Sequence, residues 1–212
     1  MDPSADRRQR AISAFRTENA RDPNHIADGA GALRPRELVD AERLAAWVLR
    51  LEPNASEALV LASHCQHLRR WELPRTEFEP GRIGYLKWRK ALARFHADSA
   101  CEILRGVGYD AATIAEVRQI NMKQGLQVNH DAQAMEDALC LSFLEHELGE
   151  FAGKHPDDKV VDIIAKTWAK MSERGHAAAL ALAPALPDAV RALIGRALTR
   201  PDPSPSSAAA VS

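Results

Sequence analysis

The chain has 212 residues with an ordinary globular composition: 46% are hydrophobic, 27% are charged, and the net charge at pH 7 is −1. It has no apolar run of about 18 residues, which excludes a membrane span. The polar start MDPSADRRQR has no apolar segment, so we expect no secretory signal. Cys65, Cys101 and Cys140 are widely spaced within apolar helical patterns, so we expect buried thiols in a cytoplasmic protein.

Proline and glycine positions divide the chain into eight predicted helices, and no segment shows a convincing strand alternation. The helices are expected at about residues 10–19, 35–52, 54–71, 85–107, 111–120, 132–151, 157–183 and 187–198. The sequence therefore predicts an all-α fold, a single compact multi-helix bundle. We expect a disordered N-terminus at 1–10, the domain at 11–183, an additional C-terminal helix at 184–199 and a disordered tail at 200–212, which is rich in Pro, Ser and Ala.

Three predicted helices place ionisable residues towards their packed sides. Asp137 shares an i, i+4, i+7, i+11 stripe with three leucines, and Glu136 lies one position round the helix. His96 lies on an apolar stripe of its helix, and His64 and His67 share another. Two histidines and one or two carboxylates could converge on a divalent metal. The alternative is that each is a hydrogen-bonded core residue.

A basic cluster lies between Arg69 and Arg94, with eight Lys or Arg against three Glu and a net charge of +5. Such a cluster in a neutral protein is a candidate anion site. The predicted anion-binding side chains are Arg70, Arg75, Arg89 and Lys123. Alternatively, these residues form a solvated face or salt bridges with Glu72, Glu77 and Glu79.

Several motifs resemble an uncharacterised family of bacteria, plants and fungi that is placed with the HD-domain superfamily. They are QHLRRWELPR, GYLKWR, FHADSA, QAMEDALCLSFLE and KTWAKMSERGHAAAL, and the resemblance covers about residues 10–182. HD-domain proteins are all-helical, metal-dependent phosphohydrolases that hold one or two metals with a His, a His–Asp doublet and a later Asp. The resemblance implies an HD-domain-like bundle.

The resemblance places the doublet near Gln66–His67, a further His at His96 and the last Asp at Asp137. It implies His67, His96 and Asp137 as ligands of a divalent metal, with Mn, Mg, Fe, Co and Zn not distinguished. In an enzyme of this kind we expect Glu136 as a further ligand or general base, so Glu136 and Asp137 are the predicted catalytic residues. The bridging Asp of the doublet is missing, and the helix that supplies the first His offers Glu37, Asp40 or Glu42 instead.

Two functions follow from these patterns. The first is a metal-dependent phosphohydrolase that acts on a nucleotide or other phosphate ester. The second is a non-catalytic HD-like module that binds the phosphate of a nucleotide or RNA through the basic cluster. We expect a phosphate-bearing small molecule as partner, with RNA as an alternative and no membrane; no pattern indicates an oligomeric state. The dipeptide His130–Asp131 is interpreted as a helix cap rather than a metal doublet.

Overall fold

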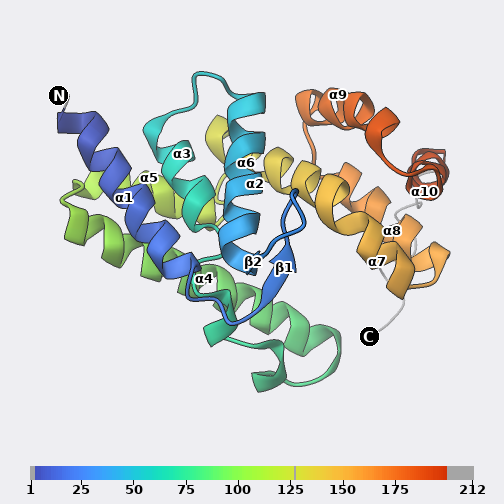
Figure 1. The fold of residues 1–212 in the computed structure, drawn as a ribbon, viewed down its shortest axis with the longest axis horizontal. Helices are drawn as coiled ribbons and strands as arrows, with labels where there is room; N and C mark the ends of the chain where they lie inside the picture. Colours follow the sequence, from blue (N-terminus) through green and yellow to red (C-terminus); the bar gives the residue numbers. More distant parts are fainter. Residues whose placement is uncertain (1–2, 127, 200–212) are drawn as a thin grey trace. The chain divides into compact units, whose positions relative to one another are not determined.

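A computed structural model of the chain describes residues 3–126 and 128–199. Within these residues the backbone forms ten α-helices and one short hairpin, so the predicted all-α class is confirmed (Figure 1). The chain divides into two compact units, residues 1–142 and 143–212. The predicted tail at 200–212 and residues 1 and 2 lie outside the described residues.

The described residues of the first unit, 3–126 and 128–142, form six α-helices, the hairpin and two 3₁₀ turns. In chain order they are α1 (Pro3–Asn19), β1 (His25–Ala27), β2 (Leu33–Pro35), α2 (Arg36–Leu51), α3 (Glu57–Cys65), η1 (Arg70–Glu72), η2 (Arg75–Glu77), α4 (Gly81–Val107), α5 (Ala111–Asn121) and α6 (His130–Ser142).

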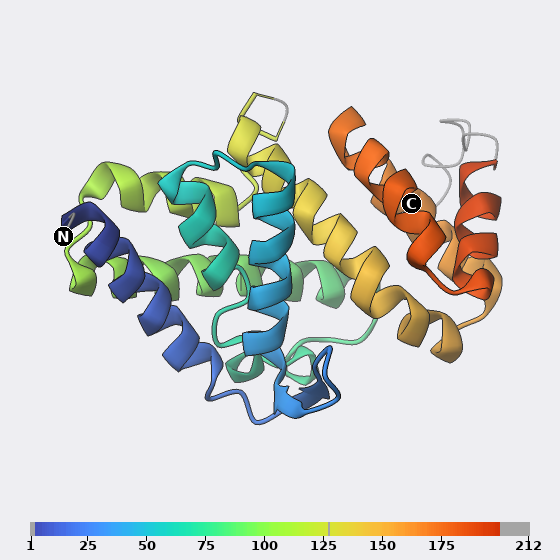
Figure 2. The same ribbon diagram turned by 45° about the horizontal axis from the view of Figure 1, so that its top comes forward.

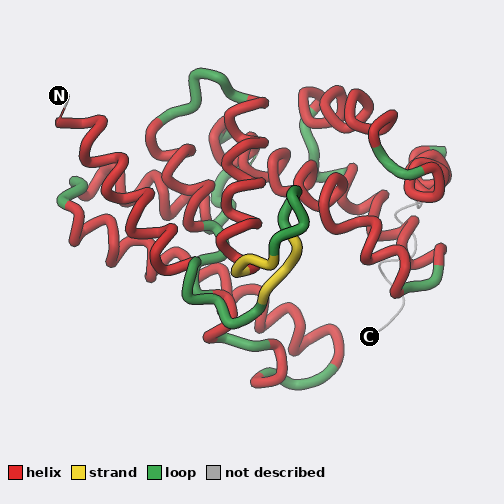
Figure 3. The backbone as a smooth tube through the Cα atoms, in the orientation of Figure 1, coloured by secondary structure: helices red, strands yellow, loops and turns green. Residues whose placement is uncertain are grey.

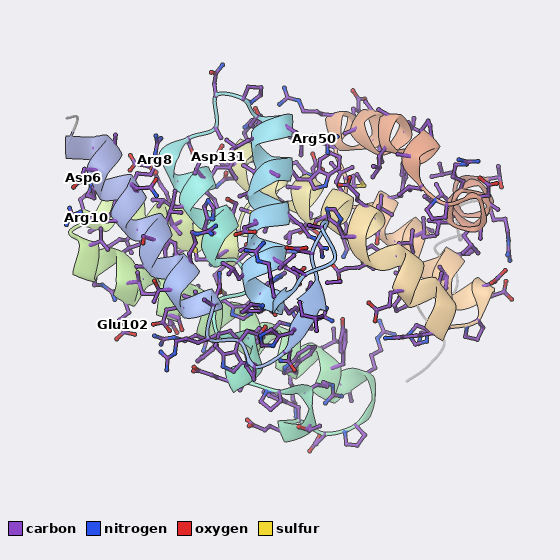
Figure 4. All side chains as sticks on the ribbon, in the orientation of Figure 1. Asp6, Arg8, Arg10, Arg50, Glu102 and Asp131 are labelled. Carbon is purple, nitrogen blue, oxygen red and sulfur yellow. The ribbon has the colours of Figure 1, made fainter. Side chains whose placement is uncertain are left out.

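Helix α1 begins at Pro3, earlier than the start near residue 10 that the sequence predicted. Two contacts support the extra turns. Asp6 pairs with Arg10 one turn later at 3.2 Å, and the guanidinium of Arg7 lies 4.5 Å from the ring centroid of Tyr109 (Figure 4 labels Asp6 and Arg10). The expected disorder at residues 3–10 is therefore replaced by helix.

The hairpin between α1 and α2 was not predicted from the sequence. Its strands have only three residues each and pair antiparallel, with Ile26 opposite Arg34 (Figure 3). The turn is held by Asp28, whose Oδ1 accepts hydrogen bonds from the backbone N–H groups of Ala30 and Ala32. Strands this short show no alternation of apolar residues, so only the Asp- and Gly-rich turn could have signalled them.

The core of the first unit forms where α2 packs against α3 and α6, and where α5 packs against α3 and α4 (Figures 1 and 2). Helix α2 has a well-defined apolar side, with Val39, Leu44, Trp47 and Val48 buried. The largest fully buried side chains of this unit are Phe15, Val48, Leu59, Leu61, Leu68, Leu104, Val117, Ile120, Met135 and Leu141.

Helix α3 ends at Cys65, six residues before the predicted end at Trp71. Two long-range contacts take the following residues out of the helix. The backbone carbonyl of Leu68 accepts a hydrogen bond from His96 Nδ1, and Arg69 adopts a left-handed conformation (φ 55°) while its side chain bonds Glu18. Tertiary contacts thus override the local helical pattern.

Helix α6 begins at His130, and its cap differs from the one expected. Asn129 Oδ1 accepts the backbone N–H of Ala132, which is the capping bond. Asp131, predicted as the cap, instead accepts a hydrogen bond from the Ser56 hydroxyl at the start of α3 (Figure 4). The predicted cap residue, Asp131, is therefore wrong: Asn129 caps α6.

The second unit contains the remaining helices. They are a π-helical turn η3 (Phe143–Glu147), α7 (Leu148–Lys154), α8 (Asp157–Trp168), α9 (Glu173–Leu182), the 3₁₀ turn η4 (Ala183–Ala185) and α10 (Asp188–Leu198). The predicted helix at 157–183 is interrupted after Trp168, and the Ser172 hydroxyl caps α9 by accepting the N–H of Gly175. Within residues 3–126 and 128–199, no helix is both long and apolar enough to cross a membrane.

Candidate functional site

The site is organised around Glu37 in the first turn of α2. Pro35 precedes this helix and cannot cap it with a side chain. Asp22 takes over that role, because its Oδ2 accepts the backbone N–H of Glu37 at 3.0 Å and its Oδ1 accepts the N–H of Asn24 at 2.9 Å. Asp22 is buried, and the loop before the hairpin is thereby fixed to the start of α2.

The Glu37 side chain is turned into the protein, with only 4% of its surface exposed. Burial raises its pKa to about 8, with Asp40 and Asp22 adding to the effect while Arg70 and Arg36 oppose it. Its Oε2 has no hydrogen-bond partner among the described residues. At neutral pH this carboxyl is therefore mostly protonated.

Two side chains from the segment after α3 approach Glu37. His67 Nδ1 lies 3.8 Å from Glu37 Oε2, and Arg70 Nε lies 3.8 Å from Glu37 Oε1. Burial and the charge of Arg70 lower the pKa of His67 well below its ordinary value. Because Glu37 is protonated and His67 is neutral, their contact at neutral pH is not an ion pair.

His96 from α4 lies behind His67, with the two ring centroids 5.9 Å apart. Its Nδ1 donates to the carbonyl oxygen of Leu68 at 2.6 Å, so Nε2 carries a lone pair. That Nε2 is buried without a hydrogen-bond partner among the described residues. Burial lowers the pKa of His96 to about 4, so the ring is neutral.

The predicted carboxylates on α6 are both buried: Asp137, which the apolar stripe indicated, and Glu136, which lies one position round the helix. Glu136 forms an ion pair with Lys123, which stands in a left-handed conformation (φ 54°) after α5. The charge of Lys123 also lowers the pKa of His67, so this pair lies near the histidines. Asp137 Oδ1 accepts a hydrogen bond from Gln133 at 3.0 Å.

The structure places the rings of His67 and His96 next to each other, but a metal centre is not evident. Among the described residues, no three His, Cys, Asp or Glu side chains are grouped so that they could hold a metal ion. The charges of Arg70, Arg89 and Lys123 act on His67 and would oppose a divalent cation there. The donor set in the described part of the chain therefore does not fit a metal.

Glu37 also lines a pocket of about 410 Å³. Three of its walls carry arginines: Arg36 from the start of α2, Arg70 from η1 and Arg75 from η2. Its lining residues are Asn24, His25, Arg36, Glu37, Arg70, Trp71, Leu73, Pro74, Arg75 and Trp88. Of these described residues, Glu37 has the only carboxyl group.

The three arginines have different roles. Arg75 donates to the carbonyl oxygens of Phe78, Glu79 and Gly81 at 2.7–3.2 Å, which fixes the turn that leads into α4. That turn is tight, because a Cβ on Gly84 would lie 1.9 Å from the Glu79 carbonyl oxygen. Most of the donor capacity of Arg75 is therefore used by the fold.

Arg70 and Arg36 are held less firmly. The Arg70 guanidinium lies 5.5 Å from the Trp88 ring centroid and 3.8 Å from Glu37. Trp88 is itself fixed by a hydrogen bond from Nε1 to the Leu73 carbonyl oxygen at 2.9 Å. Arg36 makes no hydrogen bond or ion pair through its side chain within the described residues. Both guanidinium groups are available to a ligand.

Of the four predicted anion-binding residues, Arg70 and Arg75 line this pocket, whereas Arg89 and Lys123 do not. The sequence analysis did not predict Arg36 as a site residue. It named Glu37 only as one of three acidic residues on the helix that supplies the first metal-binding His in HD-domain proteins. A signal for Arg36 was present, because a cation in the first turn of a helix is opposed by the helix dipole.

Comparisons with known proteins place the whole arrangement in one family. No curated protein matches the chain, and no solved structure matches it. A family model described as "Domain of unknown function (DUF4202)" matches residues 9–194, which includes the pocket and most of the second unit. The chain therefore belongs to this family, the domain of unknown function DUF4202.

Proposed function

We propose that the protein binds a phosphate-bearing small molecule in the pocket lined by Arg36, Arg70 and Arg75. The observation that supports this proposal most is the charge of the pocket. Three guanidinium groups from three segments meet there, and the only carboxyl among the described lining residues is Glu37, which burial keeps largely protonated at neutral pH. Guanidinium groups bind phosphate oxygens in a bidentate manner.

The rest of the pocket suits an ester rather than a free anion. A volume of about 410 Å³ falls within the range of small-molecule sites. Trp71 and Trp88 supply aromatic surface, and Asn24 supplies a polar group for the part of the ligand beyond the phosphate. We further propose a cytoplasmic location, which the three free, buried thiols support.

To test this proposal, calorimetry at constant ionic strength would measure the binding of inorganic phosphate, of a nucleoside monophosphate and of a short RNA. We expect the small phosphates to bind, and Arg70→Ala or Arg36→Ala to weaken binding at least tenfold. Arg105→Ala is the matched control, because Arg105 is exposed on α4 and does not line the pocket. Equal affinities for Arg70→Ala and Arg105→Ala would refute the proposal. Preference for RNA over the mononucleotide would favour a nucleic-acid site instead.

Hydrolysis of the bound ester is a second candidate function. The resemblance to HD-domain phosphohydrolases and the adjacent rings of His67 and His96 favour it. A divalent metal, if bound, would polarise the phosphoryl group and activate water. Because the described residues do not fit a metal, we assign Glu136 and Asp137 no catalytic step.

Metal content decides this candidate. Protein purified without an affinity tag would be equilibrated with Mn²⁺, Mg²⁺, Fe²⁺, Co²⁺ or Zn²⁺, and bound metal measured by mass spectrometry. Stoichiometric metal in the wild type that is lost in His67→Ala, with His25→Ala as control, would support hydrolysis. Equal metal content in all three proteins would remove it.

A further inference from the structure

The first half of α4 presents large apolar side chains to solvent. Ile83 and Leu86 are 70% and 55% exposed, and they lie three positions apart in the first two turns of the helix. Residues at this spacing lie on the same side of a helix. The buried side of these turns consists of Gly84, Trp88 and Leu92. Ile83 and Leu86 therefore contribute little to the core of the first unit.

Cations continue the same side of α4 beyond these two residues. Lys87, Lys90 and Arg94 follow Ile83 at i+4, i+7 and i+11, and all three are exposed. Residues 81–97 contain five cations and no acid. We call this surface the α4 face; its residues are Ile83, Leu86, Lys87, Lys90 and Arg94.

The fold makes little use of the cations of the α4 face. Within residues 3–126 and 128–199, Lys90 and Arg94 make no hydrogen bond or ion pair through their side chains. Lys87 Nζ lies 3.9 Å from Glu79, but both side chains are at least 65% exposed, and such a pair contributes little in water. The three cations line a groove of about 500 Å³. The α4 face thus combines positive charge with apolar surface that the rest of the protein leaves open.

Of the anionic partners that could meet the α4 face, a membrane surface fits it best. A nucleic acid would pair with the cations but would leave Ile83 and Leu86 without a partner, because bases stack on aromatic and not on aliphatic side chains. A stable protein interface takes about 20–30 residues on each side, and the α4 face has far fewer. Figure 1 shows the start of α4 at the lower edge of the first unit, where no other element of this unit lies beyond it. A lipid surface can adapt to a small protruding helix end of this kind.

We propose that the α4 face docks the protein on an anionic membrane surface. Ile83 and Leu86 enter the boundary between headgroups and acyl chains, to a depth of about 5–10 Å. The cations, which follow one to three turns further along the helix, contact the anionic headgroups. The sequence analysis expected no membrane partner because no apolar run is long enough to span one, but binding at the surface needs no such run. None of these residues lines the arginine pocket, so this inference does not rest on the proposed function.

The test is co-sedimentation of the protein with vesicles of phosphatidylcholine, either alone or with about one third of phosphatidylglycerol. Affinity would be measured at low salt for the wild type, Ile83→Gln/Leu86→Gln and Lys90→Gln/Arg94→Gln. The four residues are exposed, so both double variants should fold. Leu180→Gln is the matched apolar control, because Leu180 is 56% exposed on α9.

We expect the wild type to bind the anionic vesicles, and to lose this binding at about 0.5 M salt. Removing Lys90 and Arg94 should weaken binding about 25-fold, at roughly fivefold for each cation. Arg8→Gln/Arg105→Gln removes the same charge from exposed positions elsewhere and should cost less than about threefold. Ile83→Gln/Leu86→Gln should weaken binding at least about tenfold, whereas Leu180→Gln should match the wild type.

A fluorescent label reports on insertion directly. Cys65, Cys101 and Cys140 are buried, so a thiol-reactive, polarity-sensitive dye would label the folded variant Ile83→Cys at the introduced position. Its emission should shift to the blue with anionic vesicles, because the dye enters a less polar environment. The same dye on Leu180→Cys should not respond.

Each outcome decides for or against the α4 face. Absence of binding to anionic vesicles at low salt overturns the inference, and so does equal binding by the wild type and Ile83→Gln/Leu86→Gln. Vesicle binding without a response of the dye at position 83 means that another surface inserts. Binding to polyglutamate but not to vesicles, lost in Lys90→Gln/Arg94→Gln, would identify an acidic protein as the partner instead. All these variants should bind phosphate like the wild type, so failure here leaves the proposed function untouched.

Discussion

Replacement of Glu37 by Gln should stabilise the protein above neutral pH. The pKa of Glu37 is about 8 in the folded protein, against an ordinary value of 4.5. Between these two values the folded state binds more protons than the unfolded state. The free energy of unfolding of the wild type therefore falls as pH rises through this window, and the contribution of Glu37 is fully present only below about pH 4.5.

The size of the effect follows from the two pKa values. One pKa unit corresponds to about 1.4 kcal/mol, so keeping Glu37 protonated costs the folded state roughly 3 kcal/mol at pH 7 relative to the unfolded chain. Between pH 6.5 and pH 8 the wild type should lose about 1.5 kcal/mol through this group alone. Glu37→Gln cannot titrate, so its stability should not show this decline.

Urea unfolding at pH 6.5, 7.2 and 8 measures the difference. Tryptophan fluorescence reports on the first unit through Trp47, Trp71 and Trp88. Glu72→Gln is the matched control and should follow the wild type, because Glu72 is exposed. Parallel curves for the wild type and Glu37→Gln would refute the reasoning, since they would mean that Glu37 has the same pKa in both states.

Three further predictions concern the surroundings of the site and the second unit. Burial lowers the pKa of His64 to about 4, so below pH 6.5 the unfolded state binds more protons than the folded state. As the pH falls from 6.5 to 4.5, His64→Gln should therefore lose about 1–2 kcal/mol less stability than the wild type, measured by urea unfolding. Asp22→Ala removes the acceptor for the N–H groups of Asn24 and Glu37 and should cost about 1–3 kcal/mol, which a thermal melt compared with an exposed Asp98→Ala control would show. Ser172→Ala removes the cap of α9 and should cost about 1 kcal/mol; no change would mean that another group satisfies this helix end.

Helix class was predictable because it depends on local periodicity. Ile114, Val117 and Ile120 have the spacing of one helical face, and all three are buried in α5, which lies where the sequence predicted a helix at 111–120. Asp110, directly before this helix, caps it by accepting the N–H of Thr113. Patterns of this kind depend on residues no more than about four positions apart, so they can be recognised from the sequence alone.

The site was only partly predictable because its contacts are long-range. His67 and His96 do lie together, but His67 stands in a turn rather than on the helical stripe that suggested it. The helix ends because the Leu68 carbonyl bonds His96, a contact between residues 28 positions apart. The capping of α2 by Asp22 across 15 positions is a similar case. Local periodicity contains no information on either contact.

Some arginines of the basic cluster make contacts that stabilise the fold, and others do not. Arg69 pairs with Glu18 at 2.8 Å, and Arg75 bonds the carbonyl oxygens of the turn before α4. These two cations contribute to the native structure, although they bond Glu18 and backbone carbonyls and not the side chains of Glu72, Glu77 and Glu79 that the sequence alternative named. Removing either should therefore lower stability whether or not a ligand is present.

Arg36 and Arg70 differ in this respect. Arg36 lies in the first turn of α2, where the helix dipole disfavours a cation, and it has no ion pair within the described residues. Arg70 lies against a carboxyl that burial keeps mostly protonated at neutral pH. The two cations repel each other across the pocket, and Asp40, which interacts electrostatically with both, does not line it. A bound anion would reduce this repulsion, and for this reason we place the proposed phosphate ligand in the pocket rather than at the two histidines.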